Sequence, residues 1–152
     1  MTTTWNDVVT AEPEFAARVR ANFDANRHKT IATLRADGSP RISGIELDFA
    51  ADGLSFGSMP DARKGADLRR DPRFAVHSAT VDPPEGDDAG WVGDAKISGR
   101  AVYSGALDGP VDGDRFGVEI REVVRISLNG TATAMVVETW TAAGGLRRIE
   151  RA

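Results

Sequence analysis

Apolar residues recur at helical spacing along the first part of the chain. Thr4 precedes the first apolar positions and Asp7 follows three residues later, which is the pattern of a capping box at the start of a short helix. The apolar face of that helix is expected to hold Trp5, Val8 and Val9. A second helix is predicted from Glu12-Pro13 to about Asn26, with a core face of Phe15, Ala16, Val19 and Phe23. Residues 1–28 are therefore expected to form an N-terminal helical segment.

From Thr30 onward the apolar period changes to two, which is typical of half-buried strands. The pattern predicts three strands, at 30–35, 41–49 and 54–57, and we expect them to form an antiparallel meander. Turn residues separate them, at 37–40 (Asp-Gly-Ser-Pro) and 51–53 (Ala-Asp-Gly).

The same alternation continues in the second half of the chain, where strands are predicted at 73–79, 94–104, 118–128, 131–140 and 146–150. Residues 105–117 are expected to be loop, and Asn129-Gly130 predicts a two-residue hairpin. Within the 131–140 strand, the apolar side chains Met135, Val137 and Trp140 either fill the barrel or face a partner. Seven or eight short strands joined by tight turns favour a mainly β fold, an antiparallel barrel rather than a Rossmann sheet.

The bulk properties fit one soluble domain over residues 1–152. The formal net charge of −4 and the absence of a long basic tract argue against a nucleic-acid partner. No apolar run is long enough for a membrane span and no leader pattern is present, so we expect no membrane partner and a cytoplasmic location. Residues 81–92 are acidic and rich in proline and glycine, and we expect an exposed, flexible loop there.

Most familiar catalytic patterns are missing. The chain has no cysteine, and its two histidines, His28 and His77, form no metal-binding pair, so no metal site is expected. His28 is expected to interact with the dipole at the end of the second helix, and His77 to have a structural role. There is no serine-hydrolase elbow, no Rossmann glycine motif and no P-loop, and no catalytic residue is predicted.

Residues 53–72 hold the most informative stretch. A strand leads into a helix predicted over 58–70, whose free amides Ser58 is expected to cap, and Asp71-Pro72 ends it. Arg63 and Lys64 then fall in the first turns, where the helix dipole disfavours cations. Two interpretations stay open: an anion such as phosphate binds there, or Asp61 and other carboxylates neutralise the pair.

Three segments together resemble a known superfamily: TLRADGSPRISG (33–44), GLSFGSMPDARKGADLRRDPRFAVH (53–77) and GDAKISGRAV (93–102). They are similar to the split β-barrel flavoproteins of the pyridoxamine 5′-phosphate oxidase-like superfamily, whose members use FMN or the deazaflavin F420. The resemblance implies a six-stranded antiparallel split β-barrel with flanking helices. It also implies a homodimer that binds its cofactor in a groove between the subunits, and a small-molecule substrate.

The resemblance also assigns roles to residues. It implies that Arg41, Arg63 and Lys64 hold the cofactor phosphate, that Ser58 and Met59 line the flavin, and that Ser43 belongs to the same cofactor site. Two positions depart from the pattern of the superfamily: Ala62 replaces a serine before the Arg-Lys pair, and Glu46 stands where true pyridoxamine phosphate oxidases have a substrate-binding lysine.

Three functions follow as expectations. The first is a flavin- or F420-dependent oxidoreductase that transfers hydride to or from a small organic molecule. The second is a non-catalytic carrier of a flavin, F420 or haem. The third is an interaction protein whose cofactor site has decayed.

Overall fold

The structure is a computed structural model that describes residues 2–152. It begins with two helices, α1 (Trp5–Ala11) and α2 (Pro13–Asp24). The predicted capping box is present: the Asp7 carboxylate accepts a 2.7 Å hydrogen bond from the Thr4 amide, and the Thr4 hydroxyl accepts one from the Asp7 amide. Trp5 and Val8 are buried as expected, whereas Val9 is 41% exposed and does not belong to the core face.

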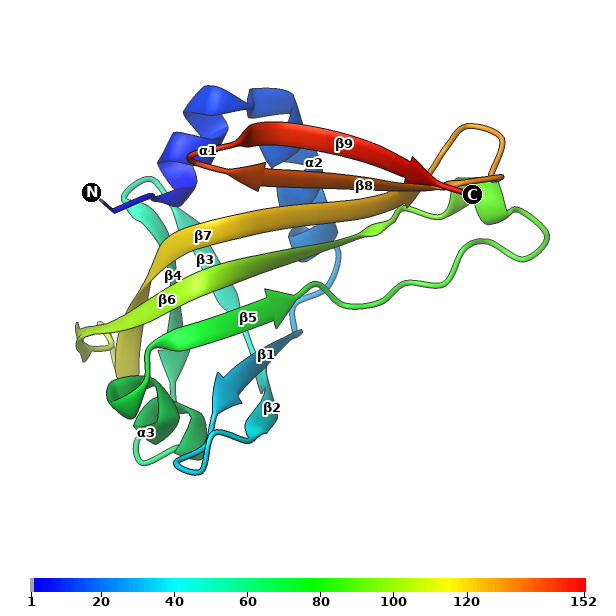
Figure 1. The fold of residues 1–152 in the computed structure, drawn as a ribbon. Helices are drawn as coiled ribbons and strands as arrows, with labels where there is room; N and C mark the ends of the chain where they lie inside the picture. The colour runs from blue at the N-terminus through cyan, green and yellow to red at the C-terminus, as the bar shows by residue number, and fades with distance from the viewer. Residues whose placement is uncertain (1) are drawn as a thin grey trace.

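Within residues 2–152, nine strands form one antiparallel sheet that curls into a barrel (Figure 1). They are β1 (Lys29–Leu34), β2 (Pro40–Ile45), β3 (Leu47–Ala50), β4 (Gly53–Ser58), β5 (Arg73–His77), β6 (Asp94–Ala106), β7 (Asp114–Leu128), β8 (Met135–Thr141) and β9 (Gly145–Arg151). The order is β2-β1-β5-β6-β7-β4-β3, and β8 and β9 extend the sheet from β7. The predicted split-barrel class is confirmed, with nine strands rather than six.

The prediction of a single strand over 41–49 is wrong. The chain leaves the sheet at Glu46: β2 pairs with β1, while β3 pairs with β4 on the other side of the barrel. The three predicted strands are therefore not a continuous meander. The bend at Glu46 instead carries the chain from one edge of the sheet to the other, and so connects the two ends of the strand order.

The helices cover the ends of the barrel. Figure 1 places α1 and α2 at one end and the short helix α3 (Arg63–Arg70) at the other, next to the β1–β2 turn. The core between them contains four fully buried phenylalanines, Phe15, Phe23, Phe56 and Phe116. Phe56 and Phe116 stack with ring centroids 5.6 Å apart, so β4 and β7 meet across an aromatic contact. Trp140 is 4% exposed and fills this core, whereas Met135 is 43% exposed.

Two loops differ from the expectation. The β6–β7 loop is shorter than predicted, because β6 runs to Ala106 and β7 begins at Asp114. The prediction of a two-residue turn at Asn129-Gly130 is wrong, because the β7–β8 connection spans 129–134. The side-chain oxygen of Asn129 accepts hydrogen bonds from the backbone amides of Thr133 and Ala134 at 2.9 and 3.2 Å. This side chain replaces the backbone bonds of a tight turn.

The segment between β5 and β6 contains a 3₁₀ turn, η1 (Asp88–Gly90), and a hydrogen bond of 2.8 Å from the Trp91 indole to the Val81 carbonyl. No helix among residues 2–152 is both long enough and apolar enough to cross a membrane.

Candidate functional site

The helix α3 begins later than predicted. Ser58 is the last residue of β4, and it is 2% exposed, so it does not cap the helix. Residues 59–62 form a turn instead, in which the Ala62 amide donates to the Met59 carbonyl and Asp61 has a φ of 59°. Ala62 is the N-cap, and no side chain of the described residues caps the first turn of α3. The first amides of α3 therefore have no capping partner within residues 2–152.

The cations at this helix start have few protein partners. Within residues 2–152, Arg63 forms no ion pair or hydrogen bond through its side chain, and Lys64 makes one contact, from Nζ to the Gly44 carbonyl at 3.4 Å. Within residues 2–152, Asp61 forms no ion pair with Arg63 or Lys64. The interpretation that carboxylates neutralise the two cations therefore lacks support. Two positive side chains beside uncapped amides form a donor-only surface, which suits an oxyanion.

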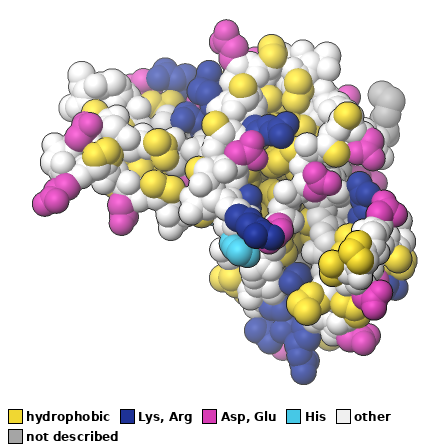
Figure 2. Space-filling view, turned by 180° about the vertical axis from the view of Figure 1, so that it is seen from behind, with side chains coloured by type: hydrophobic (Ala, Val, Ile, Leu, Met, Phe, Trp, Pro, Cys, Tyr) yellow, Lys and Arg dark blue, Asp and Glu magenta, His cyan; other side chains and the backbone are white. Residues whose placement is uncertain are grey.

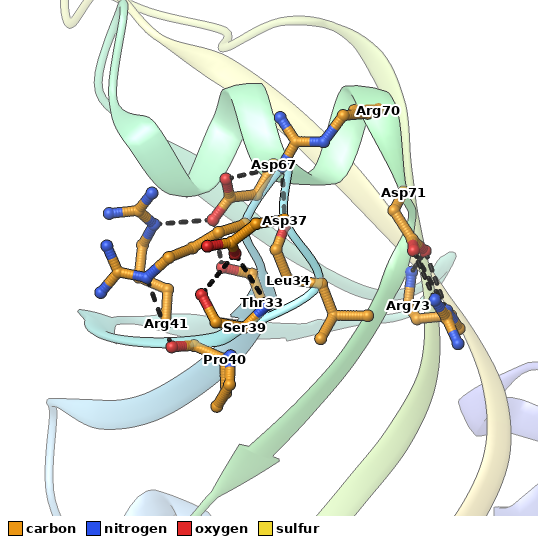
Figure 3. Close-up of polar contacts among 11 residues, drawn as sticks. Thr33, Leu34, Asp37, Ser39, Pro40, Arg41, Asp67, Arg70, Asp71 and Arg73 are labelled. Carbon is orange, nitrogen blue, oxygen red and sulfur yellow. Dashed lines mark hydrogen bonds and ion pairs between the residues drawn. The ribbon is translucent and has the colours of Figure 1, made fainter.

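Arg41 reaches the same helix from β2 (Figure 3). Its Nε donates a 2.7 Å hydrogen bond to Oδ2 of Asp67, whose side chain is 4% exposed. The Thr33 hydroxyl donates to Oδ2 at 2.8 Å, and Arg70 Nη2 donates to Oδ1 at 3.0 Å. Asp67 thus fixes one nitrogen of Arg41, and the terminal nitrogens of that guanidinium have no partner among the described residues.

Asp67 stays ionised in this setting. Burial by itself would raise the pKa of Asp67, but the hydrogen bonds from Arg41, Thr33 and Arg70 outweigh it and hold the pKa below its ordinary value. Asp67 was not predicted as a site residue from the sequence. The available signal was its position three residues before Arg70, which places the two side chains as neighbours on the surface of α3.

A groove opens beside this helix, with a volume of about 660 Å³. It is bounded by the 46–48 bend, by β4 and by the β6–β7 loop, and it includes the side of Ser58 and Met59. Met59 is 75% exposed. Ser58 links the groove to α3, because a Cβ built on Gly65 would lie 3.3 Å from the Ser58 hydroxyl oxygen.

The six predicted cofactor residues therefore fall into two adjoining groups. Ser58 and Met59 line the groove. The others, Arg41, Ser43, Arg63 and Lys64, lie on β2 and the start of α3, outside the groove lining. Ser43 is half-buried between Arg41 and the Gly44 carbonyl that Lys64 contacts. Figure 2 shows Lys and Arg side chains gathered at the lower end of the molecule, where Figure 1 places α3 and the β1–β2 turn.

The residues present fit a phosphate group. The helix-start amides, the Lys64 ammonium and the guanidinium groups of Arg63 and Arg41 are all donors, and phosphate offers several acceptor oxygens. Neither histidine takes part. His28 lies beyond the end of α2 and contacts Glu46 at 3.5 Å, so its predicted interaction with the helix end is wrong. His77 faces Asp94 at 3.6 Å. No group of three metal-ligating side chains occurs in the described part of the chain.

No sequence-family profile matches the chain, and no curated protein is similar to it in sequence. Solved structures do share its fold. A pyridoxamine 5′-phosphate oxidase-related, FMN-binding protein from Nostoc punctiforme matches with a TM-score of 0.65 at 10% identity, over 93% of this chain and 96% of that one. PhzG from Burkholderia lata, solved with tetrahydrophenazine-1-carboxylic acid, matches with a TM-score of 0.64 at 13% identity, over 97% and 95% of the two chains.

A heme-binding protein from Mycobacterium smegmatis has the same fold, with a TM-score of 0.55 at 13% identity over 88% of this chain and 87% of that one. At these identities the comparisons define the architecture, and that architecture serves proteins that bind different cofactors.

Proposed function

The chain has the split β-barrel fold of the pyridoxamine 5′-phosphate oxidase-like proteins, and on that premise we propose that it is an oxidoreductase that binds FMN or the deazaflavin F420. The cofactor phosphate would bind at the start of α3. The flavin ring would lie along Ser58 and Met59, toward the groove.

One observation carries this proposal: an uncapped helix start lies beside two cations that no carboxylate among residues 2–152 pairs with. Cations near a helix N-terminus are unfavourable by about 0.3–1 kcal/mol each. A phosphate at this position would reverse that cost, because it would accept hydrogen bonds from the amides and from Arg63 and Lys64 together. The guanidinium of Arg41 on β2 would be the third cation in contact with the phosphate.

The bound flavin would supply the hydride chemistry. The protein would bind the phosphate, orient the ring against β4 and keep water from part of it. This division explains why the described residues offer a binding surface without an obvious acid–base pair.

We also propose that the protein acts as a homodimer with the cofactor groove at the interface. Two large apolar side chains near the proposed site are strongly exposed, Ile42 at 74% and Met59 at 75%. Exposed apolar side chains beside an open groove fit a surface that a second subunit covers.

The test is a titration of the purified protein with FMN and, separately, with F420, followed by absorbance and fluorescence. We expect binding of at least one of them in the micromolar range or tighter. The double variant Arg63→Ala/Lys64→Ala should weaken that binding by about 100-fold, because two charge-assisted contacts are lost. The matched control is Arg147→Ala/Arg148→Ala on β9, which removes the same charge elsewhere. Equal effects of the two double variants would refute the phosphate site.

Turnover separates the enzyme from a carrier. Steady-state assays of the loaded protein with a panel of hydride donors and acceptors should show repeated turnover for an oxidoreductase. A protein that holds the cofactor tightly and never turns over would be the carrier.

Haem is the alternative ligand, and one contact favours it. His28 lies 3.5 Å from Glu46, a residue of the groove lining, so an imidazole is available at the groove edge. Haem titration should then give a Soret shift that His28→Ala removes and His77→Ala keeps.

A further inference from the structure

The groove next to the proposed cofactor site has an unusual floor. In the β3–β4–β7 register, Asp48 stands opposite Ser55, and Ser55 stands opposite Gly117. Directly opposed residues of an antiparallel sheet point to the same face, so these positions share the outer face of the barrel. Gly117 has nothing within 4 Å of an added Cβ, and it lines a smaller hollow that adjoins the groove at Ser55.

The walls of the groove are apolar on one side and acidic on another. Leu107, Val111 and Met59 supply apolar surface, and Val111 is 68% exposed. Four carboxylates line the same groove, Glu46, Asp48, Asp108 and Asp112, against a single cation, Arg115.

Two of the four carboxylates are paired with a cation of the described chain, and two are not. Glu46 is paired with Arg27 at 2.8 Å, and Asp108 approaches Arg115 at 3.7 Å. Arg115 is shared, because it also approaches Asp52 at 3.8 Å. Asp48 and Asp112 form no ion pair or side-chain hydrogen bond within residues 2–152. The groove therefore keeps a net negative charge.

A second, independent feature points to a ligand in the same place. Ser55 is only 6% exposed, and its side chain forms no hydrogen bond within the described chain. The hydroxyl oxygen itself is open to the groove rather than sealed in the protein, so a ligand donor can reach it without displacing a protein partner. Ser55 and its cross-strand neighbour Asp48 both line this groove, so two acceptor side chains lie side by side on its wall.

We propose that this groove binds the substrate as an organic cation: an apolar or aromatic body carrying a protonated amine or amidine. The body would lie against Met59, Leu107 and Val111. The cationic nitrogen would donate hydrogen bonds to Asp48 and to the Ser55 hydroxyl, with Asp112 adding its charge from the β6–β7 loop. As a substrate assignment this rests on the proposed function, while the charge preference itself is a property of the groove and is measured without cofactor.

The assignment separates the two ends of the site by charge. The start of α3 presents cations and amides, which suit the cofactor phosphate, whereas the groove presents carboxylates. An anionic substrate would meet Asp48 and Asp112 without a free cation to offset them. Charge complementarity of this kind sets which ligand is admitted more than how tightly it binds.

The experiment uses two probes with the same ring and opposite charge, 4-aminobenzamidine and 4-aminobenzoate. Their dissociation constants are measured by equilibrium dialysis with the full-length protein, once without cofactor and once with saturating flavin. We expect the cation to bind about tenfold more tightly than the anion at low salt, and the ratio to fall toward one at high salt because ions screen exposed charges.

Variants locate the preference. Asp48→Asn/Asp112→Asn should bring the ratio of the two dissociation constants to about one. The matched control is Asp82→Asn/Asp88→Asn, which removes the same charge from the segment between β5 and β6 and should keep the wild-type ratio. Ser55→Ala should weaken the cation about fivefold, since one hydrogen bond is lost. Thermal melts of each variant verify folding, and the single variant Asp112→Asn, in an exposed loop, gives a second reading if Asp48→Asn is poorly folded.

The outcomes separate this inference from the proposed function. A cation preference that the groove variants remove supports the inference, with or without flavin binding. Flavin binding with equal affinity for both probes, or with preference for 4-aminobenzoate, overturns the inference and leaves the proposed function in place. A cation preference in a protein that binds neither FMN nor F420 overturns the proposed function instead. A preference that the control pair removes equally would show general charge attraction and overturn the assignment to the groove.

Discussion

Arg41 on β2 donates a 2.7 Å hydrogen bond from Nε to Oδ2 of Asp67 on α3, 26 residues further along the chain. This contact ties the proposed phosphate-binding helix to the barrel and turns the free end of Arg41 outward (Figure 3). Because Thr33 and Arg70 donate to the same carboxylate, Asp67 is the residue that holds strand, helix and both arginines in one arrangement.

Replacement of Asp67 by asparagine should lower both stability and cofactor affinity. The side chain is 4% exposed and loses its charge while Arg41 remains only 17% exposed, so we expect the free energy of unfolding to fall by about 2 kcal/mol. Arg41 would lose its fixed orientation, and flavin affinity should fall by about tenfold. Urea unfolding and flavin titration measure the two effects.

Asp24→Asn is the control for this variant. Asp24 pairs with Arg20 at 3.2 Å, but both side chains are at least half exposed, so the expected change is about 0.5 kcal/mol or less with unchanged flavin affinity. If Asp67→Asn matched this control in both measurements, the organising role of Asp67 would be wrong.

Stability should depend on pH in acid and hardly at all near neutrality. The pKa of Asp67 is lowered in the folded protein: burial raises it, but the hydrogen bonds from Arg41, Thr33 and Arg70 outweigh that effect. The hydrogen bonds from Arg73 lower the pKa of Asp71 to about 2. A carboxyl group with a depressed folded pKa stabilises the protein above its unfolded pKa of about 3.9, and this contribution is lost as the pH falls toward the folded pKa.

We therefore expect the urea midpoint to be level above about pH 5 and to drop between about pH 4 and pH 2. Asp67→Asn should make that drop smaller, whereas Asp71→Asn should change it little because the Asp71–Arg73 pair is exposed to solvent. A drop that both variants leave unchanged would assign acid sensitivity to other carboxylates.

The secondary structure that local rules determine was predictable from the sequence. The capping box at Thr4 and Asp7 and the apolar spacing of α2 are signals within a few residues, and both helices are confirmed. The bend at Glu46 gives no such signal, because Ile45, Leu47 and Phe49 keep the same alternation through it. Which strand each half pairs with is decided by the closed barrel.

The site was predictable only in part for the same reason. The positions of Arg63 and Lys64 at a helix start follow from the sequence, and the helix does begin at Arg63. The prediction that Ser58 caps this helix was wrong, because residues 59–62 form a turn that the positions of Ser58 and Pro60 do not predict. Asp67 was missed, since its main partner comes from a strand 26 residues away.

Alanine at Gly99 should damage the barrel. A Cβ at this position would lie 2.0 Å from the Glu119 carbonyl oxygen and 3.0 Å from the Arg121 amide nitrogen, and both are backbone atoms of β7. The β6–β7 register shifts at Ser98/Gly99, so the two strands approach closely there. We expect Gly99→Ala to lower the free energy of unfolding by about 3 kcal/mol or more.

Gly117→Ala is the matched comparison on β7. Its added Cβ would have nothing within 4 Å, so the expected change is about 1 kcal/mol or less. Chemical unfolding of the two variants side by side measures the difference, and similar losses would contradict the close approach at Gly99.

The exposed side chain of Ile42 gives a test of the proposed homodimer. Ile42 is on β2, an edge strand whose one pairing within residues 2–152 is with β1, and its side chain is 74% exposed on the strand face opposite to that of Arg41 and Ser43. A second subunit that covers the cofactor groove would bury it, so Ile42→Glu would place a charge in an apolar interface. Sedimentation velocity should show a dimer for the wild type at low micromolar concentration and a monomer for Ile42→Glu, with weaker flavin binding in the monomer.

Val92→Glu is the control for this variant and should stay dimeric. Val92 is 51% exposed, and its carbonyl accepts a hydrogen bond from Asn22 near the far end of α2. A wild-type protein that sediments as a monomer and still binds flavin at full affinity would place the complete cofactor site within one chain.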